Sequence, residues 1–170
     1  MADEVLLYLV RHAIAANRGP EFPDDAKRPL TEEGIARFEE VAAGLVAMGV
    51  EIEAVFTSPF VRARQTADLL AGAYKRPPRV TPLDALAVGR RPSDIVDALG
   101  KVAKRRSVAL VGHEPLLGEL TAQLLGAKRP IPFKKGGVAC VTVAALPPLS
   151  GGTLVWFLTP RLLRRLAKGR

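Results

Sequence analysis

The chain has only one cysteine and no long apolar segment near its start. Cys140 is the only cysteine among its 170 residues, so an internal disulfide is excluded and no cysteine pair can bind a metal ion. This cysteine usage is typical of a reducing compartment, and we expect the protein to be cytoplasmic. The first apolar run, residues 5–10, has no basic region before it, and charge follows it at once. We therefore expect neither a signal peptide nor a membrane span there.

Aromatic side chains are also scarce, at 5% of the sequence. Surfaces that bind nucleic acid often interleave aromatic and basic side chains, so we expect no nucleic-acid partner despite the formal net charge of +8. That charge favours anionic ligands over cationic ones. Near the C-terminus leucines alternate with basic residues, which predicts an amphipathic helix with a solvated basic face rather than a membrane patch. The basic residues of this helix are Arg161, Arg164, Arg165, Lys168 and Arg170.

Several motifs for nucleotide, metal and hydrolase chemistry are missing. The sequence has no Walker glycine loop, no Gly-x-Gly-x-x-Gly fingerprint and no Gly-x-Ser-x-Gly elbow. It also lacks the His-Glu-x-x-His helix motif, and a zinc site normally needs three or four ligands. We therefore expect no cofactor and no metal ion.

Short apolar runs alternate with helical patterns along the chain. Its length and apolar content fit one domain over residues 1–170. The apolar runs have little polar alternation, which is typical of strands covered on both faces of a parallel sheet. The pattern predicts a three-layer α/β/α sandwich with a mostly parallel sheet. The expected strands are residues 5–10, 54–57, a brief one near Val80, 107–111, and an antiparallel pair at the side of the sheet, 138–144 and 154–158.

Cap residues and helix-stopping glycines predict four further helices. A serine or threonine before an apolar-periodic segment is a favoured N-cap, and proline suits the first helical position. The first expected helix has Thr31 as its cap and stops at about Gly49, and the second has Ser58 as its cap, Pro59 as its first residue and an end at about Ala71. The third has Ser93 as its cap and ends at about Lys104, and the fourth follows the turn at residues 112–115 and ends at Leu125.

Polar residues follow three of the expected strands directly. Arg11 and His12 end the first apolar run, Arg62 lies in the segment that begins at Ser58, and His113 follows the run that ends at Val111. Ligands of open α/β sheets gather at the carboxyl ends of the strands. The chain has only two histidines, and both stand at such positions. Two imidazoles and two guanidinium groups there indicate an oxyanion site, and phosphate suits it.

Four segments carry a resemblance to a known family, in the right order over most of the chain. The histidine phosphatase superfamily is the family that they resemble, and its fold is phosphoglycerate mutase-like. The short length and the Arg-Pro-Leu-Thr run are similar to its SixA-type phosphohistidine phosphatase branch. These segments are Arg11-His12-Ala13, Arg28-Pro29-Leu30-Thr31, residues 58–67 (Ser-Pro-Phe-Val-Arg-Ala-Arg-Gln-Thr-Ala), and Val111-Gly112-His113-Glu114-Pro115.

The resemblance implies a role for each of these residues. His12 would be the nucleophile that accepts a phosphoryl group on nitrogen before water removes it. Arg11, Arg62 and His113 would surround the phosphoryl oxygens, because phosphoryl transfer depends chiefly on positioning and charge stabilisation. Arg28 either reaches toward the bound phosphate or leaving group, or is a surface cation before a helix cap.

The general acid is the least defined part of this site. Asp84 and Glu114 are the candidates, but either could be a surface carboxylate, and Glu114 could simply favour the N-terminus of the next helix. A weak acid suits an imidazole leaving group, which can be protonated near neutral pH, better than it suits an alkoxide. N-phosphoryl substrates are therefore favoured.

These observations lead to one functional expectation with two alternatives. We expect a metal-independent phosphatase that acts on phosphohistidine in a protein. A phosphomonoesterase for small metabolites is the nearest alternative, and a non-catalytic phosphate-binding module is the other. The oligomeric state is not predicted by the sequence.

Overall fold

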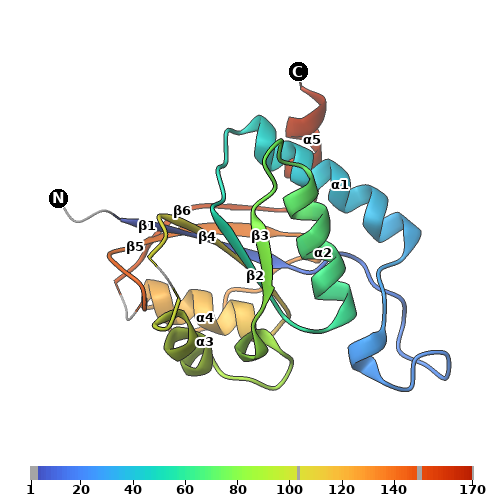
Figure 1. Cartoon of the computed structure of the whole chain (residues 1–170), viewed down its shortest axis with the longest axis horizontal. Coiled ribbons are helices and arrows are strands. Elements are labelled where there is room, and N and C mark those ends of the chain that lie inside the picture. Colours follow the sequence, from blue (N-terminus) through green and yellow to red (C-terminus); the bar gives the residue numbers. More distant parts are fainter. Residues whose placement is uncertain (1–3, 103, 149–150, 170) are drawn as a thin grey trace.

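The computed structural model describes residues 4–102, 104–148 and 151–169 and contains one six-stranded sheet (Figure 1). Its strands are β1 (Val5–Arg11), β2 (Ala54–Thr57), β3 (Arg79–Pro82), β4 (Ser107–Gly112), β5 (Val138–Val143) and β6 (Thr153–Leu158). They lie in the order β3-β2-β4-β1-β5-β6. The first four positions pair in parallel, whereas β5 is antiparallel to both β1 and β6. The expected parallel sheet with an antiparallel pair at its side is confirmed.

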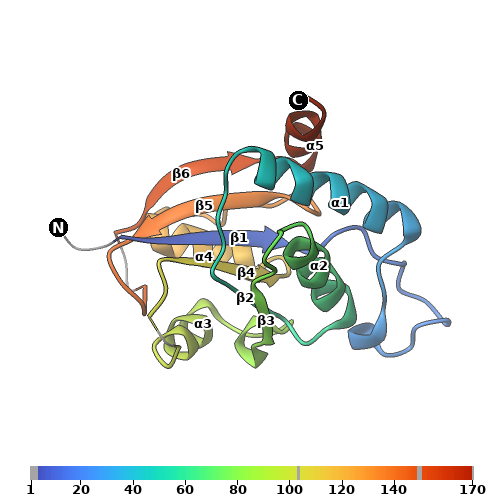
Figure 2. The ribbon, with the colours of Figure 1, turned by 45° about the horizontal axis from the view of Figure 1, so that its top comes forward.

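Helices cover both faces of this sheet, as Figure 2 shows. The helices are α1 (Glu32–Ala47), α2 (Val61–Gly72), α3 (Pro92–Leu99), α4 (Leu116–Leu125) and α5 (Pro160–Lys168), with the short 3-10 turns η1 (Asp25–Lys27) and η2 (Asp84–Leu86). Buried residues of α1, α2 and α5 form one hydrophobic cluster with the sheet. Those of α3 and α4 form a second cluster on the opposite face. The three-layer α/β/α sandwich is therefore confirmed.

The central strands have apolar residues on both faces because both faces are covered. In β1, Leu7 and Leu9 belong to the cluster beneath α3 and α4, whereas Tyr8 and Val10 belong to the cluster beneath α1 and α2. All six residues of β4 are buried. A strand buried on two sides needs no polar alternation, which explains the continuous apolar runs in the sequence.

Three helix ends agree with the cap residues and helix ends predicted from the sequence. The Thr31 hydroxyl accepts a hydrogen bond from the Gly34 N–H at 2.9 Å, so Thr31 is the N-cap of α1. Gly49 follows this helix with a φ of 77°, a conformation that glycine adopts readily. The helix α4 ends at Leu125 as expected.

Two other helix starts differ from the prediction. The helix α2 begins at Val61 with Phe60 as N-cap, because the Ser58 hydroxyl accepts from the Phe60 N–H at 3.2 Å and Pro59 lies in a bend before the helix. Arg62 still lies in the first turn.

In α3 the cap is Arg91 rather than Ser93, since Pro92 takes the first helical position and the Asp94 carboxylate accepts from the Arg91 N–H at 2.9 Å. This helix ends at Leu99, well before the expected Lys104.

The C-terminal helix α5 packs along α1. Leu163 is fully buried between them, whereas Leu162 and Leu166 are exposed. Arg164 is half-buried and pairs with Glu40 of α1 at 2.8 Å, but the other described basic residues of α5 are exposed, as expected. Arg170 lies outside the described residues. No helix in the described part of the chain combines the length and the apolar character that a membrane crossing requires.

The close approach of α1 to α5 depends on Gly44. A β-carbon at this position would overlap the backbone carbonyl of Leu163. We expect Gly44→Ala to lower the free energy of unfolding by about 1–3 kcal/mol, because backbone must move to make room. The matched control is Gly72→Ala at the end of α2, where nothing lies within 4 Å of the added carbon. Urea unfolding should show that the control is neutral or slightly stabilised, and equal losses for the two variants would contradict the packing argument.

Candidate active site

Three neighbouring parallel strands end at the same edge of the sheet. In the register of β1, β4 and β2, Arg11 lies beside Gly112 and Thr57 lies beside Val111. The residues that follow are held in place by backbone hydrogen bonds, from the His12 N–H to the Gly112 carbonyl at 3.0 Å and from the Ser58 N–H to the Val111 carbonyl at 2.9 Å. His113 directly follows β4. The sheet therefore brings His12, Ser58 and His113 together.

The two histidines pack against each other at this edge. Their ring centroids are 5.1 Å apart, and the residues are only 6% and 2% exposed. His12 Nδ1 lies 2.7 Å from the Ala13 carbonyl oxygen. Because a carbonyl only accepts, Nδ1 carries the proton, and Nε2 of the neutral ring keeps a free electron pair. His12 thus has the tautomer that a nitrogen nucleophile needs.

His113 is held by residues that follow β2. Its Nε2 lies 2.8 Å from the Ser58 hydroxyl, and the Phe60 ring packs edge-on against it with centroids 5.2 Å apart. The other ring nitrogen, Nδ1, is buried without a hydrogen-bond partner among the described residues. Sequence reasoning assigned Ser58 only to helix capping, and its contact with His113 requires two strand ends to meet.

Burial keeps both imidazoles neutral. Burial is the main cause that lowers the pKa of His12 from 6.5 to about 3. The hydrogen bond to Ala13 raises this pKa, but the positive charges of Arg62 and Arg11 also lower it. The pKa of His113 also falls to about 3, through burial and then through repulsion from a protonated His12 and from Arg62. An unfolded histidine titrates near 6.5, so protonation between pH 6.5 and 3 favours the unfolded chain. The two rings contribute stability above pH 6.5, and that contribution is lost as the pH falls through this window.

Arg62 reaches the site from the first turn of α2 and is 2% exposed. Its Nη1 donates to the Asp25 carbonyl at 2.7 Å, and its Nη2 donates to Asp25 Oδ2 at 3.0 Å. The guanidinium also lies over the Phe60 ring, 5.2 Å from its centroid. Its Nε is buried and has no partner among the described residues. The side chain is therefore fixed in place with donor capacity left over.

Asp25 is the centre of a cluster of arginines that the sequence analysis missed. Its Oδ1 lies 3.0 Å from Arg28 Nη2 and 3.2 Å from Arg18 Nε, while Oδ2 binds Arg62. Partial burial opposes ionisation, but hydrogen bonds from Arg62 and Arg28 lower the pKa of Asp25 overall. One ionised carboxylate thus joins three guanidinium groups. The sequence feature that could have predicted part of this cluster is the three-residue spacing between Asp25 and Arg28, which a helical turn brings together.

Arg28 is not a solvated surface cation. Its side chain is 11% exposed, and its Nη1 donates to the Ala16 carbonyl at 2.7 Å in addition to the Asp25 contact. Through Asp25 it belongs to the same cluster as Arg62.

Arg11 and Glu114 both hold the segment around Phe133. Arg11 Nη1 donates a hydrogen bond to the Phe133 carbonyl at 2.6 Å. Burial lowers the pKa of Arg11, and the negative charge of Glu114 opposes this shift. Burial raises the pKa of Glu114, against the charge of Arg11 and hydrogen bonds from the Phe133 and Gly118 backbone. Its Oε1 is buried and has no partner in the described part of the chain. Glu114 therefore interacts electrostatically with Arg11 of the site.

Asp84 differs from the other candidate residues. It lies at the start of η2 and is exposed. Within residues 4–102, 104–148 and 151–169, its side chain has no hydrogen bond or ion pair with the histidines or arginines described above. The structure thus gathers five of the candidates, His12, His113, Arg11, Arg62 and Arg28, with Glu114 beside Arg11, and leaves Asp84 apart.

The assembled groups suit an anion. Arginine keeps its charge and can bond two oxygens at once, so Arg11 and Arg62 beside a neutral imidazole are chemically suited to a tetrahedral oxyanion. Such donors also stabilise charge that develops on the oxygens during transfer. Across the described residues, no group of three or more His, Cys, Asp or Glu side chains is placed to hold a metal ion.

The neutrality of both histidines can be measured directly. The untagged chain gives only two imidazole signals, since it has only two histidines. We expect neither signal to titrate near pH 6.5 in a proton NMR titration, because burial lowers both pKa values to about 3. A denatured sample is the control, and there both should titrate near 6.5. A midpoint near 6.5 for His12 in the folded protein would contradict the assignment.

The Asp25 cluster predicts a second measurable effect. Asp25→Ala leaves the buried Arg62 without its carboxylate, and we expect a loss of about 2 kcal/mol in the free energy of unfolding. The neighbouring variant Asp24→Ala is the control, since Asp24 is exposed, caps η1, and lies 4.0 Å from the exposed Lys27. It should lose less than about 1 kcal/mol. Equal losses in urea unfolding would show that the arginines do not depend on Asp25.

Comparison with known proteins shows similarity over most of the chain. The family described as histidine phosphatase superfamily (branch 1) matches residues 7–87. The phosphohistidine phosphatase SixA of Escherichia coli is 31% identical over 160 residues, which cover 91% of this chain and 93% of that protein. An uncharacterized protein of Picosynechococcus is 38% identical over 119 residues, which cover 66% of this chain and 68% of that protein.

A solved structure has the same fold. The structure of the protein histidine phosphatase SixA complexed with tungstate superposes with a TM-score of 0.80 and 30% sequence identity. The superposition covers 94% of this chain and 99% of that chain. The order of the motifs, the fold and the extent of these matches agree, and the chain belongs to the histidine phosphatase superfamily.

Proposed function

We propose that this phosphatase hydrolyses phosphohistidine in a protein, through a phosphorylated intermediate on His12. The observation that carries the proposal is the hydrogen bond from His12 Nδ1 to the Ala13 carbonyl, which leaves Nε2 unprotonated. Arg62, Arg11 and His113 all lie close enough to act electrostatically within the same pocket. The similarity to a phosphohistidine phosphatase over nearly the whole chain supports the same substrate class.

In the first step, His12 Nε2 attacks the phosphorus atom. The Nε2–P bond forms as the P–N bond of the substrate breaks, and the electron pair of that bond returns to the substrate imidazole. If the distal nitrogen of that ring is protonated, the imidazole leaves neutral. The phosphorylated His12 keeps its Nδ1 proton and is therefore a cationic ring, which the Ala13 carbonyl stabilises.

In the second step, water attacks the same phosphorus atom. The Nε2–P bond breaks, and its electron pair returns to Nε2, so His12 regains its neutral form and dihydrogen phosphate leaves. Arg11 and Arg62 stabilise the phosphoryl oxygens in both steps. Arg28 acts through Asp25, which it shares with Arg62, and so helps to position the guanidinium that contacts phosphate.

His113 changes its protonation state when the anion binds. In the free protein burial and neighbouring cations keep it neutral. A phosphoryl dianion beside it favours the cationic form, because opposite charges stabilise each other in a buried site. The ring then supplies both a donor and a positive charge to the phosphoryl oxygens.

The carboxylates favour a nitrogen leaving group over an alkoxide. Asp84 is exposed and apart from the histidines, and the Glu114 carboxylate interacts with the backbone of Gly118 and Phe133. A phosphomonoester needs a strong proton donor, and the lack of one costs about 10²–10⁴-fold in rate. An imidazole leaving group does not have this requirement. The buried, unpaired Cys140 fits a reducing cytoplasm as the place of the reaction.

Substrate comparison tests this proposal. We expect kcat/KM for a synthetic phosphohistidine peptide to exceed that for a sugar phosphate by about 100-fold or more, because only the ester needs a strong acid. Acid-labile radioactive phosphate should be trapped on the wild-type enzyme, and His12→Ala should abolish both labelling and turnover. His12→Ala should keep the wild-type circular dichroism spectrum.

Three outcomes distinguish the alternatives. A preference for the sugar phosphate would make the chain a small-molecule phosphomonoesterase. Binding of both phosphates without turnover would make it a phosphate-binding module. Turnover by His12→Ala at near wild-type rate would remove His12 as the nucleophile.

A further inference from the structure

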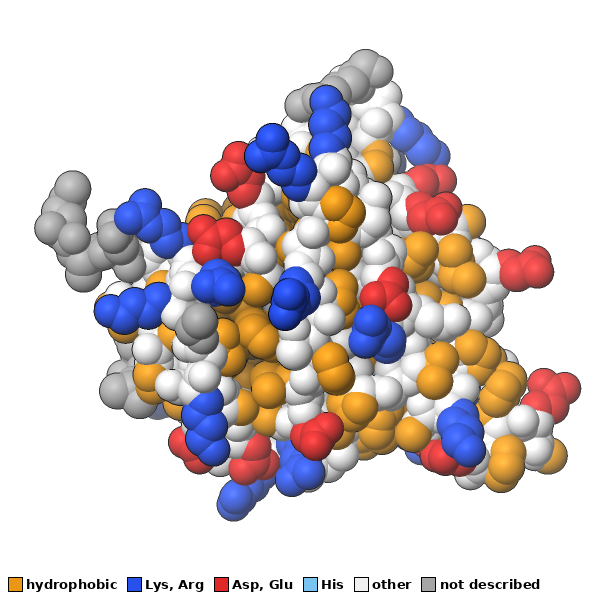
Figure 3. Space-filling model, in the orientation of Figure 1, with side chains coloured by type: hydrophobic (Ala, Val, Ile, Leu, Met, Phe, Trp, Pro, Cys, Tyr) orange, Lys and Arg blue, Asp and Glu red, His pale blue; other side chains and the backbone are white. Residues whose placement is uncertain are grey.

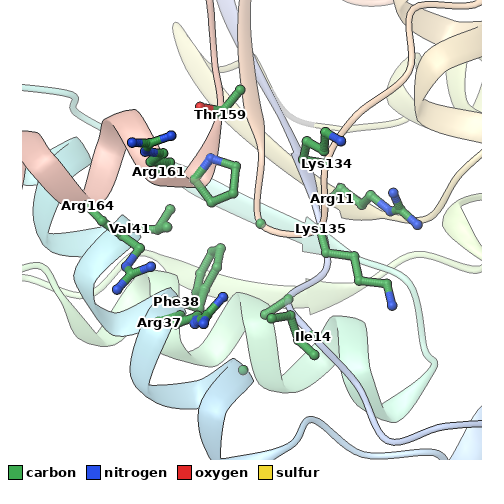
Figure 4. Close-up of a pocket in the computed structure, with 14 residues that line it drawn as sticks. Arg11, Ile14, Arg37, Phe38, Val41, Lys134, Lys135, Thr159, Arg161 and Arg164 are labelled. Carbon is green, nitrogen blue, oxygen red and sulfur yellow. The ribbon is translucent and has the colours of Figure 1, made fainter.

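A basic groove lies beside the active site, between α1, the start of α5 and residues 134–136 (Figure 4). Its volume is about 770 Å³. None of the described residues that line it is acidic. Figure 4 shows Arg161 and Arg164 on one side of the groove and Arg11, Lys134 and Lys135 on the other. Its six basic lining residues are Arg11, Arg37, Lys134, Lys135, Arg161 and Arg164.

Three of these cations are available to a ligand. Arg37 pairs with Glu33, Arg164 pairs with Glu40, and Arg11 donates to the Phe133 carbonyl. Lys134, Lys135 and Arg161 are exposed, and the described residues offer their side chains no ion pair. On the face shown in Figure 3, by contrast, basic and acidic side chains are interspersed. The groove therefore concentrates uncompensated positive charge beside the pocket.

The N-terminus of α5 adds to this charge. Thr159, its N-cap, makes no side-chain capping bond, and the first turn contains no acidic residue. Thr159, Pro160 and Arg161 all line the groove. The positive end of the helix dipole thus lies at the groove beside exposed cations.

The groove is elongated rather than enclosed. It follows one side of α1 from Gly34 to Val41, a rise of roughly 10 Å. This length corresponds to about three residues of extended peptide. Ile14 and Pro160 are partly exposed in the lining and offer apolar contact between the cations.

The groove borders the catalytic residues. Arg11 and Ala13 line it, and Ala13 accepts the hydrogen bond from His12 Nδ1. The charge of Lys135 also lowers the pKa of His12, after larger effects of burial and of the two arginines. A chain segment in the groove would therefore lie next to a phosphoryl group held at His12.

We propose that this groove binds an acidic segment flanking the phosphohistidine of the protein substrate. The inference rests on the proposed function and adds what the substrate must carry near its phosphohistidine. A small-molecule site usually fixes its ligand with a few converging buried polar groups, whereas Lys134, Lys135 and Arg161 are exposed along the rim of an open groove. Such an arrangement suits an extended acidic peptide, which meets several cations in succession.

Two phosphohistidine peptides of equal length test the inference. One carries Asp and Glu beside the phosphohistidine, and the other carries Asn and Gln in their place. We expect the wild-type enzyme to show a KM about tenfold lower for the acidic peptide at low salt, with similar kcat. The difference should shrink as salt screens the charges.

Charge-reversal variants of the groove test whether the acidic peptide binds there. Lys134→Glu combined with Arg161→Glu should abolish the preference for the acidic peptide while leaving kcat/KM for phosphoramidate unchanged. The matched control combines Lys75→Glu with Arg76→Glu, two exposed cations outside the groove, and should keep the preference. A third peptide with Lys beside the phosphohistidine should bind the groove variant better than it binds wild type.

The outcomes separate the two proposals. If wild type cleaves phosphoramidate but neither phosphohistidine peptide, the protein-phosphohistidine function fails, and this inference fails with it. If wild type cleaves the acidic and neutral peptides with the same KM, only the docking groove is overturned. Retention of the acidic preference in the groove variant would also overturn it.

Discussion

The site depends on the parallel pairing of β2, β4 and β1. Because these strands run in the same direction and lie side by side, their carboxyl ends meet at one edge of the sheet. The residues after them, Ser58, His113 and His12, therefore share a small volume although they are far apart in sequence. A register shift of one residue would turn the side chains at these positions to the opposite face. The buried apolar faces of β1 and β4 oppose such a shift.

Burial at this edge of the sheet leaves the histidine imidazoles neutral, whereas the arginine guanidinium groups stay charged. An imidazole can escape the cost of desolvation by losing its proton, and both histidines are neutral for this reason. A guanidinium remains charged in a protein, so each buried arginine needs acceptors. Asp25 provides them for Arg62, and the Phe133 carbonyl provides one for Arg11. Neutral imidazoles and charged guanidinium groups thus lie together at one edge of the sheet.

Charge is distributed unevenly around the catalytic centre. Asp25 compensates part of the arginine charge on one side of the pocket, whereas the groove between α1 and α5 keeps Lys134, Lys135 and Arg161 without acidic partners in the described structure. In the proposed reaction the catalytic residues bind the phosphoryl group, which is common to many substrates. If the substrate is a phosphoprotein, as we propose, selection among phosphoproteins requires contacts outside the phosphoryl-binding residues, and the adjacent groove offers them.

Local sequence determined much of this protein. The unbroken apolar runs predicted buried strands, and Thr31 predicted the start of α1. The placement of two scarce histidines after strands predicted that their rings lie close together. The predicted caps Ser58 and Ser93 were wrong. The Ser58 hydroxyl bonds to the Phe60 N–H and to His113, and Phe60 caps α2. In α3, Pro92 takes the first helical position and Arg91 is the cap. Only the tertiary structure decided that Asp25 meets Arg62, 37 residues away, and that Arg11 meets the Phe133 carbonyl, 122 residues away. Such contacts follow from strand pairing and desolvation across the whole fold, which no short segment of sequence contains.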